Sequence, residues 1–251
     1  MTPRGAGLAA VGMLAASPFA AAGAAADPSA ACLAASESRV AASACLELRA
    51  RAAAGDLAAA TVAARDAAER LAEATGRDAA VDALAASEAA FAAYLAAECD
   101  RRRAVMDAGT GAGDADLACR AELRTRRAER LWGEVDGRPI AADAITSRAW
   151  RLVRLDGDAV LTGTAPDLTL GEDDRAGGDA STNRWFAPYH LASMGIAFGT
   201  TGTTMMFNDE PAGRMAQERR YLELLGEVNR WRLDDGRLAL LADDTPRLVF
   251  E

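Results

Sequence analysis

The composition of the chain changes near Leu131. Up to that residue Ala, Arg and Glu dominate, which are strong helix formers, and beyond it the chain is rich in Gly, Thr, Asp and Leu. A chain of 251 residues is long enough for one large or two small domains. The change therefore predicts a helical domain at residues 27–133, a linker at 134–147 and a second domain at 148–251.

Residues 1–26 have the pattern of a signal peptide. Arg4 forms a short basic start, residues 7–22 are small and apolar, and three alanines precede Asp27 as a cleavage site. We expect soluble export to the periplasm or beyond, and favour it over a retained anchor or lipoprotein processing at Cys32. After this segment no stretch is apolar enough to predict a transmembrane helix.

Four cysteines lie in the helical domain: Cys32, Cys45, Cys99 and Cys119. An even number in an exported chain predicts two disulfides, and three pairings are possible. No Cys-x-x-Cys spacing is present, and His190 is the one histidine, so we predict neither a metal site nor a cofactor.

The net charge is −9, and all 28 basic residues are Arg. This acidity argues against a nucleic-acid partner, because phosphate contacts dominate such binding. It could attract a basic protein, although solubility is the interpretation we favour.

The first domain has the pattern of an antiparallel bundle of about four helices. Asp56 and Gly76 are expected to cap one Ala-rich helix at its two ends. Another helix begins near Asp78, and a last one spans residues 116–132. Arg101, Arg102 and Arg103 are interpreted as a solvated helix face.

The second domain shows short strand patterns and one helix at residues 216–228. We predict a β-rich barrel or curved sheet, which makes the chain α+β. Asp173 and Asp174 are interpreted as a turn rather than an acid–base or metal pair. Met205 and Met206 are expected to fill gaps in the core.

The segment SEAAFAAYLAAEC, residues 87–99, resembles a helix of the lysozyme-inhibitor LprI-like family. Phe91, Tyr94 and Cys99 match its motif. The Cys32–Cys45 spacing also matches, as does CRAELRTRRAERL with Cys119, Arg127 and Leu131. The family's usual Arg-Asp pair is replaced by Leu95 and Ala96, and its usual Thr by Arg124. The resemblance covers residues 32–131 and implies engagement of a lysozyme-type muramidase.

The second domain resembles the META domain, the fold of the heat-shock lipoprotein HslJ. The match includes the opening Trp150, the STNRW segment with Asn183, and FGTTGTTMMFN with Thr203 and Thr204. The family often has cysteines where this chain has Thr182 and Asn208. The resemblance implies that a cross-link has been lost as a unit and that Trp185, Tyr189 and Phe198 supply core instead.

No arrangement typical of catalysis is present, since a triad would need His190 with Ser181 or Ser193. We therefore predict a protein that is not an enzyme, with a hydrolase as the reading we favour least. Core packing is the default for Phe91 and Tyr94, and binding is their alternative role; Asn183, Thr203 and Thr204 are the first candidates for a ligand in the second domain. The expected function is binding, through lysozyme inhibition by the first domain. The alternative is a structural or stress-resistance role of the META-like domain in the envelope. The sequence leaves the oligomeric state open.

Overall fold

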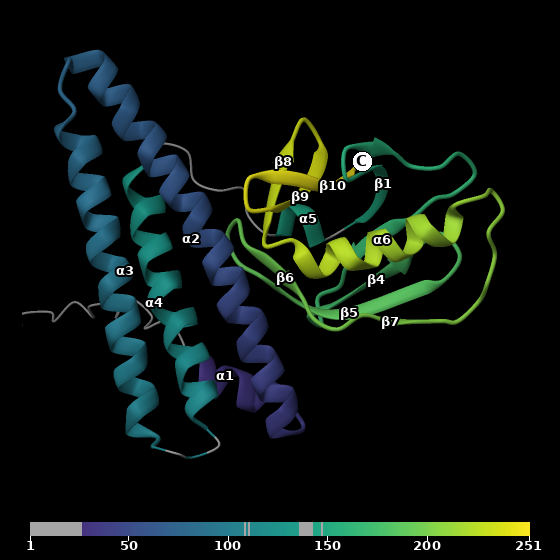
Figure 1. Cartoon of the computed structure of the whole chain (residues 1–251), viewed down its shortest axis with the longest axis horizontal. Helices are drawn as coiled ribbons and strands as arrows, with labels where there is room; N and C mark the ends of the chain where they lie inside the picture. The colour runs from purple at the N-terminus through teal and green to yellow at the C-terminus, as the bar shows by residue number, and fades with distance from the viewer. Residues whose placement is uncertain (1–26, 108, 110, 136–142, 147) are drawn as a thin grey trace, which may run out of the picture.

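The computed structural model describes residues 27–107, 109, 111–135, 143–146 and 148–251 (Figure 1). A helical part and a sheet part lie side by side, with one long helix between them. The predicted signal peptide and most of the predicted linker lie outside the described residues.

Four helices form the helical part: α1 (Pro28–Ala35), α2 (Arg39–Thr75), α3 (Ala79–Val105) and α4 (Ala112–Glu134). α4 packs along α2, and α3 packs mainly on α4. Small clusters of Ala and Leu hold these helices together, for example Ala60, Ala128 and Leu131 between α2 and α4. Because alanine buries little apolar area, this core is thin.

Helix α2 corrects one prediction. Ser38 caps its start by accepting a hydrogen bond from the amide of Ala41, and Gly76 ends it in the left-handed conformation with φ of 68°. The predicted cap at the C-terminal end is thus confirmed. The predicted N-cap at Asp56 is wrong, because Asp56 lies in the middle of the helix and is 3 % exposed.

Two disulfides brace the helical part, as predicted from the cysteine count. Cys32–Cys45 ties the short α1 to the start of α2, and Cys99–Cys119 joins α3 to α4. The structure thereby selects one of the three possible pairings.

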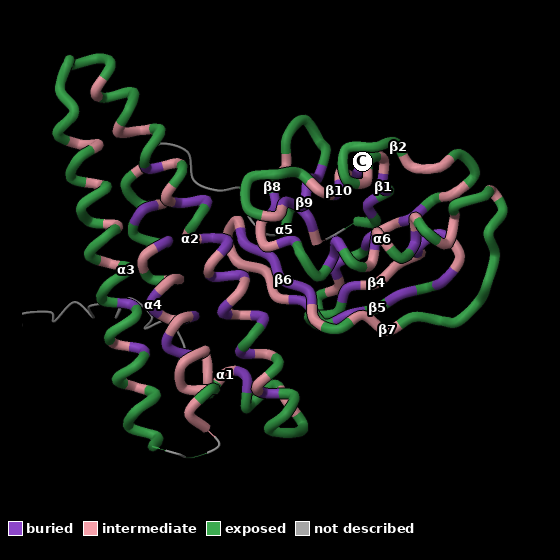
Figure 2. The backbone as a smooth tube through the Cα atoms, viewed as in Figure 1, coloured by how far each residue is buried: buried purple, intermediate pink, exposed green. Residues whose placement is uncertain are grey.

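Helix α3 is largely solvent-exposed, and Leu95 and Cys99 are its buried residues (Figure 2). Among the described residues it is the one helix whose length and composition would allow it to cross a membrane. This finding differs from the expectation that no such stretch follows the signal peptide. The criteria concern length and composition alone, and one such helix is weak evidence of a membrane span.

The sheet part begins with α5 (Asp143–Thr146), which lies within the predicted linker. The strands follow: β1 (Ala149–Leu155), β2 (Asp158–Ala159), β3 (Asp167–Leu170), β4 (Arg175–Asp179), β5 (Arg184–Leu191), β6 (Ile196–Phe198) and β7 (Gly202–Thr203). After α6 (Arg214–Glu227) come β8 (Arg230–Asp234), β9 (Arg237–Ala242) and β10 (Thr245–Phe250).

The strands form one antiparallel sheet in the order β6-β5-β4-β3-β1-β10-β9-β8, with β2 beside β1 and β7 beside β5. The sheet is not closed into a barrel, although its two edges meet at one isolated bridge between Gly195 and Arg230. The predicted α+β class, with a β-rich second part carrying one helix, is confirmed.

The core of the sheet part is built from large side chains. Along β5 the residues alternate, so that Trp185 and Tyr189 point inward while Phe186 is exposed. Trp185 makes edge-to-face contacts with Phe198 and with Tyr221 of α6, at ring-centroid distances of 6.3 and 5.9 Å. The predicted core role of Trp185, Tyr189 and Phe198 is therefore confirmed.

Helix α2 packs directly against β5, β6 and β8 (Figure 1). Leu48 and Ala52 of α2 cluster with Ala197 of β6. Two glycines permit the close approach: a Cβ on Gly55 would lie 1.8 Å from the carbonyl oxygen of Asn229, and one on Gly195 would lie 1.9 Å from that of Ala52. The guanidinium of Arg51 donates to the carbonyls of Phe198 and Gly226, at 3.0 and 2.6 Å.

Candidate functional site

The two aromatic residues suggested for the helical part differ in their surroundings. Phe91 packs against the cluster around Cys99 and Cys119, and the Arg127 guanidinium lies 5.7 Å from its ring centroid. Tyr94, one turn further along α3, is 53 % exposed. The favoured interpretation of core packing is thus confirmed for Phe91 and is wrong for Tyr94, whose ring is largely exposed.

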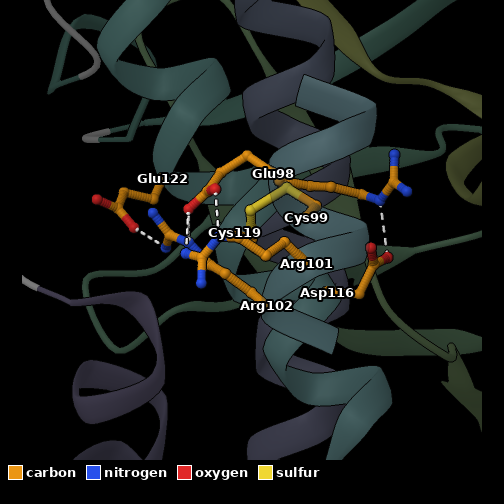
Figure 3. The surroundings of a disulfide bond; sticks show 8 residues. Glu98, Cys99, Arg101, Arg102, Asp116, Cys119 and Glu122 are labelled. Atoms are coloured by element: carbon orange, nitrogen blue, oxygen red, sulfur yellow. Dashed lines mark hydrogen bonds and ion pairs between the residues drawn. A yellow bond between two sulfur atoms is a disulfide. The ribbon is translucent and has the colours of Figure 1, made fainter. Parts of the chain in front are cut away.

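Ion pairs surround the second disulfide (Figure 3). The Glu98 carboxylate accepts from Arg101 at 2.7 Å and from Arg102 at 2.9 Å, and Arg102 also donates to Glu122 at 2.6 Å. Hydrogen bonds from the two guanidinium groups lower the pKa of Glu98 to about 2. Arg103 pairs with Asp100 at 3.2 Å. The three arginines are therefore engaged with carboxylates of their own domain.

In the sheet part, Asn183 is the centre of a buried hydrogen-bond network. Its Nδ2 donates to the Glu218 carboxylate at 2.7 Å and to the Met206 carbonyl at 2.9 Å. Its Oδ1 accepts from the Thr204 hydroxyl at 2.8 Å and from the Met206 amide at 2.7 Å. The Asn183 amide group is thus fully used within the fold. Thr203 lies on β7 and is exposed, so the three residues suggested as a ligand site have different environments.

The loop after β7 corrects a second prediction. Met205 is 98 % exposed and Met206 is 57 % exposed, so neither fills a gap in the core. Phe207 beside them is 83 % exposed. The Asn183 hydrogen bonds tie the Met206 backbone to the domain, while the three side chains of this loop stay exposed.

The two positions suggested for a lost cross-link are in contact. The Thr182 hydroxyl donates to the Asn208 carbonyl at 3.2 Å. A hydrogen bond therefore joins the segments at the place where the family resemblance implies a disulfide.

A cleft between the two parts contains the single histidine. His190, near the end of β5, lines it together with Arg49 and Asp56 of α2 and Thr125 of α4. Burial, and secondarily the charge of Arg49, lowers the pKa of His190 to about 4, so the imidazole is neutral near pH 7. Ser193 lines the same cleft, whereas Ser181 accepts a hydrogen bond from Gln217 at 2.9 Å elsewhere in the sheet part.

Asp56 connects the two parts through one carboxylate oxygen. This oxygen accepts from the Trp132 indole at 3.1 Å and from the Met194 amide at 2.9 Å. Burial raises the pKa of Asp56. Sequence reasoning missed this role. The available signal was Gly55 inside an Ala-rich helix, since a glycine there often marks a close approach of backbones.

Two family models match the chain in succession. The model described as Lysozyme inhibitor LprI matches residues 31–131, and the META domain model matches residues 143–251. The chain joins an LprI-like domain to a META domain.

The LprI-like match contains all four cysteines, and the META match begins at α5 and contains every strand of the sheet. Two solved structures are similar in part, both determined by NMR. One is 18 % identical, with 45 % of this chain and 94 % of the other covered at a TM-score of 0.37. The other, from Burkholderia xenovorans, is 26 % identical, and the match covers 47 % of this chain and 91 % of the other at a TM-score of 0.37. None of the curated proteins matches the chain.

Proposed function

We propose that this protein is an exported, non-catalytic binding protein of the cell envelope whose LprI-like domain inhibits a lysozyme-type muramidase. The family match over residues 31–131 is the observation that carries the proposal. The two disulfides support an oxidising compartment outside the cytoplasm, reached after cleavage near Ala26.

The exposed face of α3 around Tyr94 is the surface we assign to this partner. Helix α3 lies on the side of the bundle away from the META domain (Figure 1). An exposed tyrosine is a typical interface anchor, because it offers a large ring and a hydroxyl at low entropic cost. The Cys99–Cys119 disulfide holds this part of α3 against α4, so the surface is preorganised.

The residues at the family's usual Arg-Asp positions cannot supply a charged pair here. Leu95 is buried beside the disulfide, and Ala96 is exposed. Recognition must therefore use other groups. The net charge of −9 favours encounter with a basic lysozyme, and this contribution should weaken as salt is added.

The test is a titration of the mature chain against lysozymes acting on peptidoglycan. Tyr94→Ala should weaken inhibition by about tenfold or more, the effect of losing an interface anchor. Phe207→Ala is the matched control, because it removes an exposed aromatic ring from the META domain and should leave inhibition unchanged. Absence of inhibition by the intact chain at high molar excess would contradict the proposal.

A second candidate function is an envelope stress role of the META domain, favoured by the match over residues 143–251. A deletion strain should then be sensitive to heat or antibiotics. Complementation separates the two functions: rescue by the Tyr94→Ala chain as well as by the wild type would support the stress role.

A further inference from the structure

The cleft between the LprI-like and META domains is a pocket of about 300 Å³. This volume is near the lower limit of small-molecule sites, roughly 300–1,000 Å³, so it suits a compact ligand. Its walls come from α2, α4, the first residue of α1, and the end of β5 with the turn that follows. Both domains must therefore be docked for the pocket to exist.

The lining of the cleft contains both positively and negatively charged side chains. Arg49 supplies a cation, and no hydrogen bond or ion pair joins its guanidinium to another of the described residues. Its Nε is buried and has no hydrogen-bond partner in the part of the chain that the structure describes. An unpaired buried donor is costly, and a carboxylate is the acceptor that best fits a guanidinium.

The opposite charge comes from α4. Glu129 lines the cleft, and its charge contributes to raising the pKa of Asp56. Glu122 also lines the cleft, but Arg102 and Arg126 already neutralise it, at 2.6 and 2.8 Å. Asp56 lines the cleft as well, but it is buried and one of its oxygens already accepts from Trp132 and Met194. Glu129 is therefore the accessible carboxylate that can pair with a cationic ligand group.

Neutral groups complete the lining. His190 is uncharged near pH 7 and can donate or accept a hydrogen bond, and Thr125 and Ser193 carry hydroxyls. The remaining lining side chains include several alanines, which suit a small aliphatic group.

We propose that the interdomain cleft binds a small zwitterion of the amino-acid class, with its carboxylate on Arg49 and its ammonium on Glu129. A simple anion would be repelled by Glu129 and Asp56, and a simple cation by Arg49. This site is separate from the Tyr94 surface, so a failure of lysozyme inhibition does not bear on it.

Calorimetry of the mature chain with three matched compounds tests the charge requirement. Valine is the zwitterion, 3-methylbutanoate lacks its ammonium, and isobutylamine lacks its carboxylate. Saturable binding of L- or D-valine, at least about tenfold tighter than either analogue, is expected from the loss of one charge-assisted pair. Absence of saturable binding to valine, or equal binding of 3-methylbutanoate, would overturn the proposal.

Variants assign the two ends of the ligand. Arg49→Gln should weaken valine binding by about tenfold or more, whereas Arg130→Gln, which removes an exposed arginine outside the cleft, should not. Glu129→Gln should weaken valine binding and strengthen that of 3-methylbutanoate, with Glu134→Gln as its control. Unchanged valine affinity in Glu129→Gln would refute the ammonium contact.

A measurement on the wild-type chain tests the site without any variant that could misfold. In amide NMR spectra, valine should shift the signals of both Thr125 and Ser193, since these residues lie on opposite domains of the cleft. Shifts confined to other parts of the chain would place the ligand elsewhere and overturn the assignment.

Discussion

Asn183 stabilises the META domain by using both polar atoms of its side chain in the interior. It binds the Met206 backbone in the loop after β7 and the Glu218 carboxylate on α6. Asn183→Ala would leave several buried polar groups unpaired, so the free energy of unfolding should fall by about 3 kcal/mol. Urea denaturation measures this change. Asn208→Ala, at an exposed position, should lower the free energy of unfolding much less. Equal decreases in the two variants would show that the buried network does not add stability beyond an exposed asparagine.

His190 should make stability depend on pH. Burial and Arg49 lower its folded pKa to about 4 from an ordinary value of 6.5. The neutral form is thus favoured by folding, and its contribution is present above pH 6.5 and is lost as pH falls toward 4. The free energy of unfolding should fall by up to about 3 kcal/mol over this range.

The control for this prediction is His190→Gln. Urea denaturation should show that its free energy of unfolding falls less between pH 6.5 and 4 than that of the wild type. Asp56 acts in the opposite direction, because its raised pKa means that stability is gained as its carboxylate is protonated. The contribution of Asp56, like the charges of Arg49 and Glu129, is present in the wild type and in His190→Gln. It therefore cancels when the pH dependence of one is subtracted from that of the other. Identical slopes would contradict the pKa of His190.

At the scale of elements, the second disulfide should matter most for α3. That helix buries only Leu95 and Cys99, so few apolar contacts hold it to the bundle. Replacing Cys99 and Cys119 by Ala should cost about 3 kcal/mol and should reduce hydrogen-exchange protection along α3 more than along α2. Replacing Cys32 and Cys45 instead should loosen α1 and leave α3 protected. Equal protection of α3 in both variants would contradict this division.

Local patterns predicted most elements but misread those shaped by distant contacts. Gly76 ends a helix by its own backbone freedom, and β5 alternates by its own period, so both were predictable. Asp56 has the residue type of an N-cap, yet its partner Met194 lies 138 positions away in the sequence. Met205 and Met206 have core-like side chains, but both are exposed in a loop whose Met206 backbone is bound by Asn183. The cleft could not be predicted at all, because two domains form it together.

At the scale of the whole molecule, the docking of the two domains rests on close backbone contact. Gly195 approaches α2 so nearly that a Cβ would lie 1.9 Å from the Ala52 carbonyl oxygen and 2.8 Å from the Asp56 amide. Both obstacles belong to helix backbone, which cannot move aside as a side chain could. Gly195→Ala should therefore separate the domains locally while each keeps its own core.

Solution scattering should show a larger radius of gyration for Gly195→Ala. The Asp56–Met194 hydrogen bond should be lost, and hydrogen exchange should detect this as faster exchange of the Met194 amide. Gly133→Ala is the matched control, since a Cβ there meets nothing within 4 Å. Gly195→Ala should also abolish valine binding, because the cleft requires docked domains. A compact Gly195→Ala chain with normal Met194 exchange would show that the interface can adapt to a methyl group.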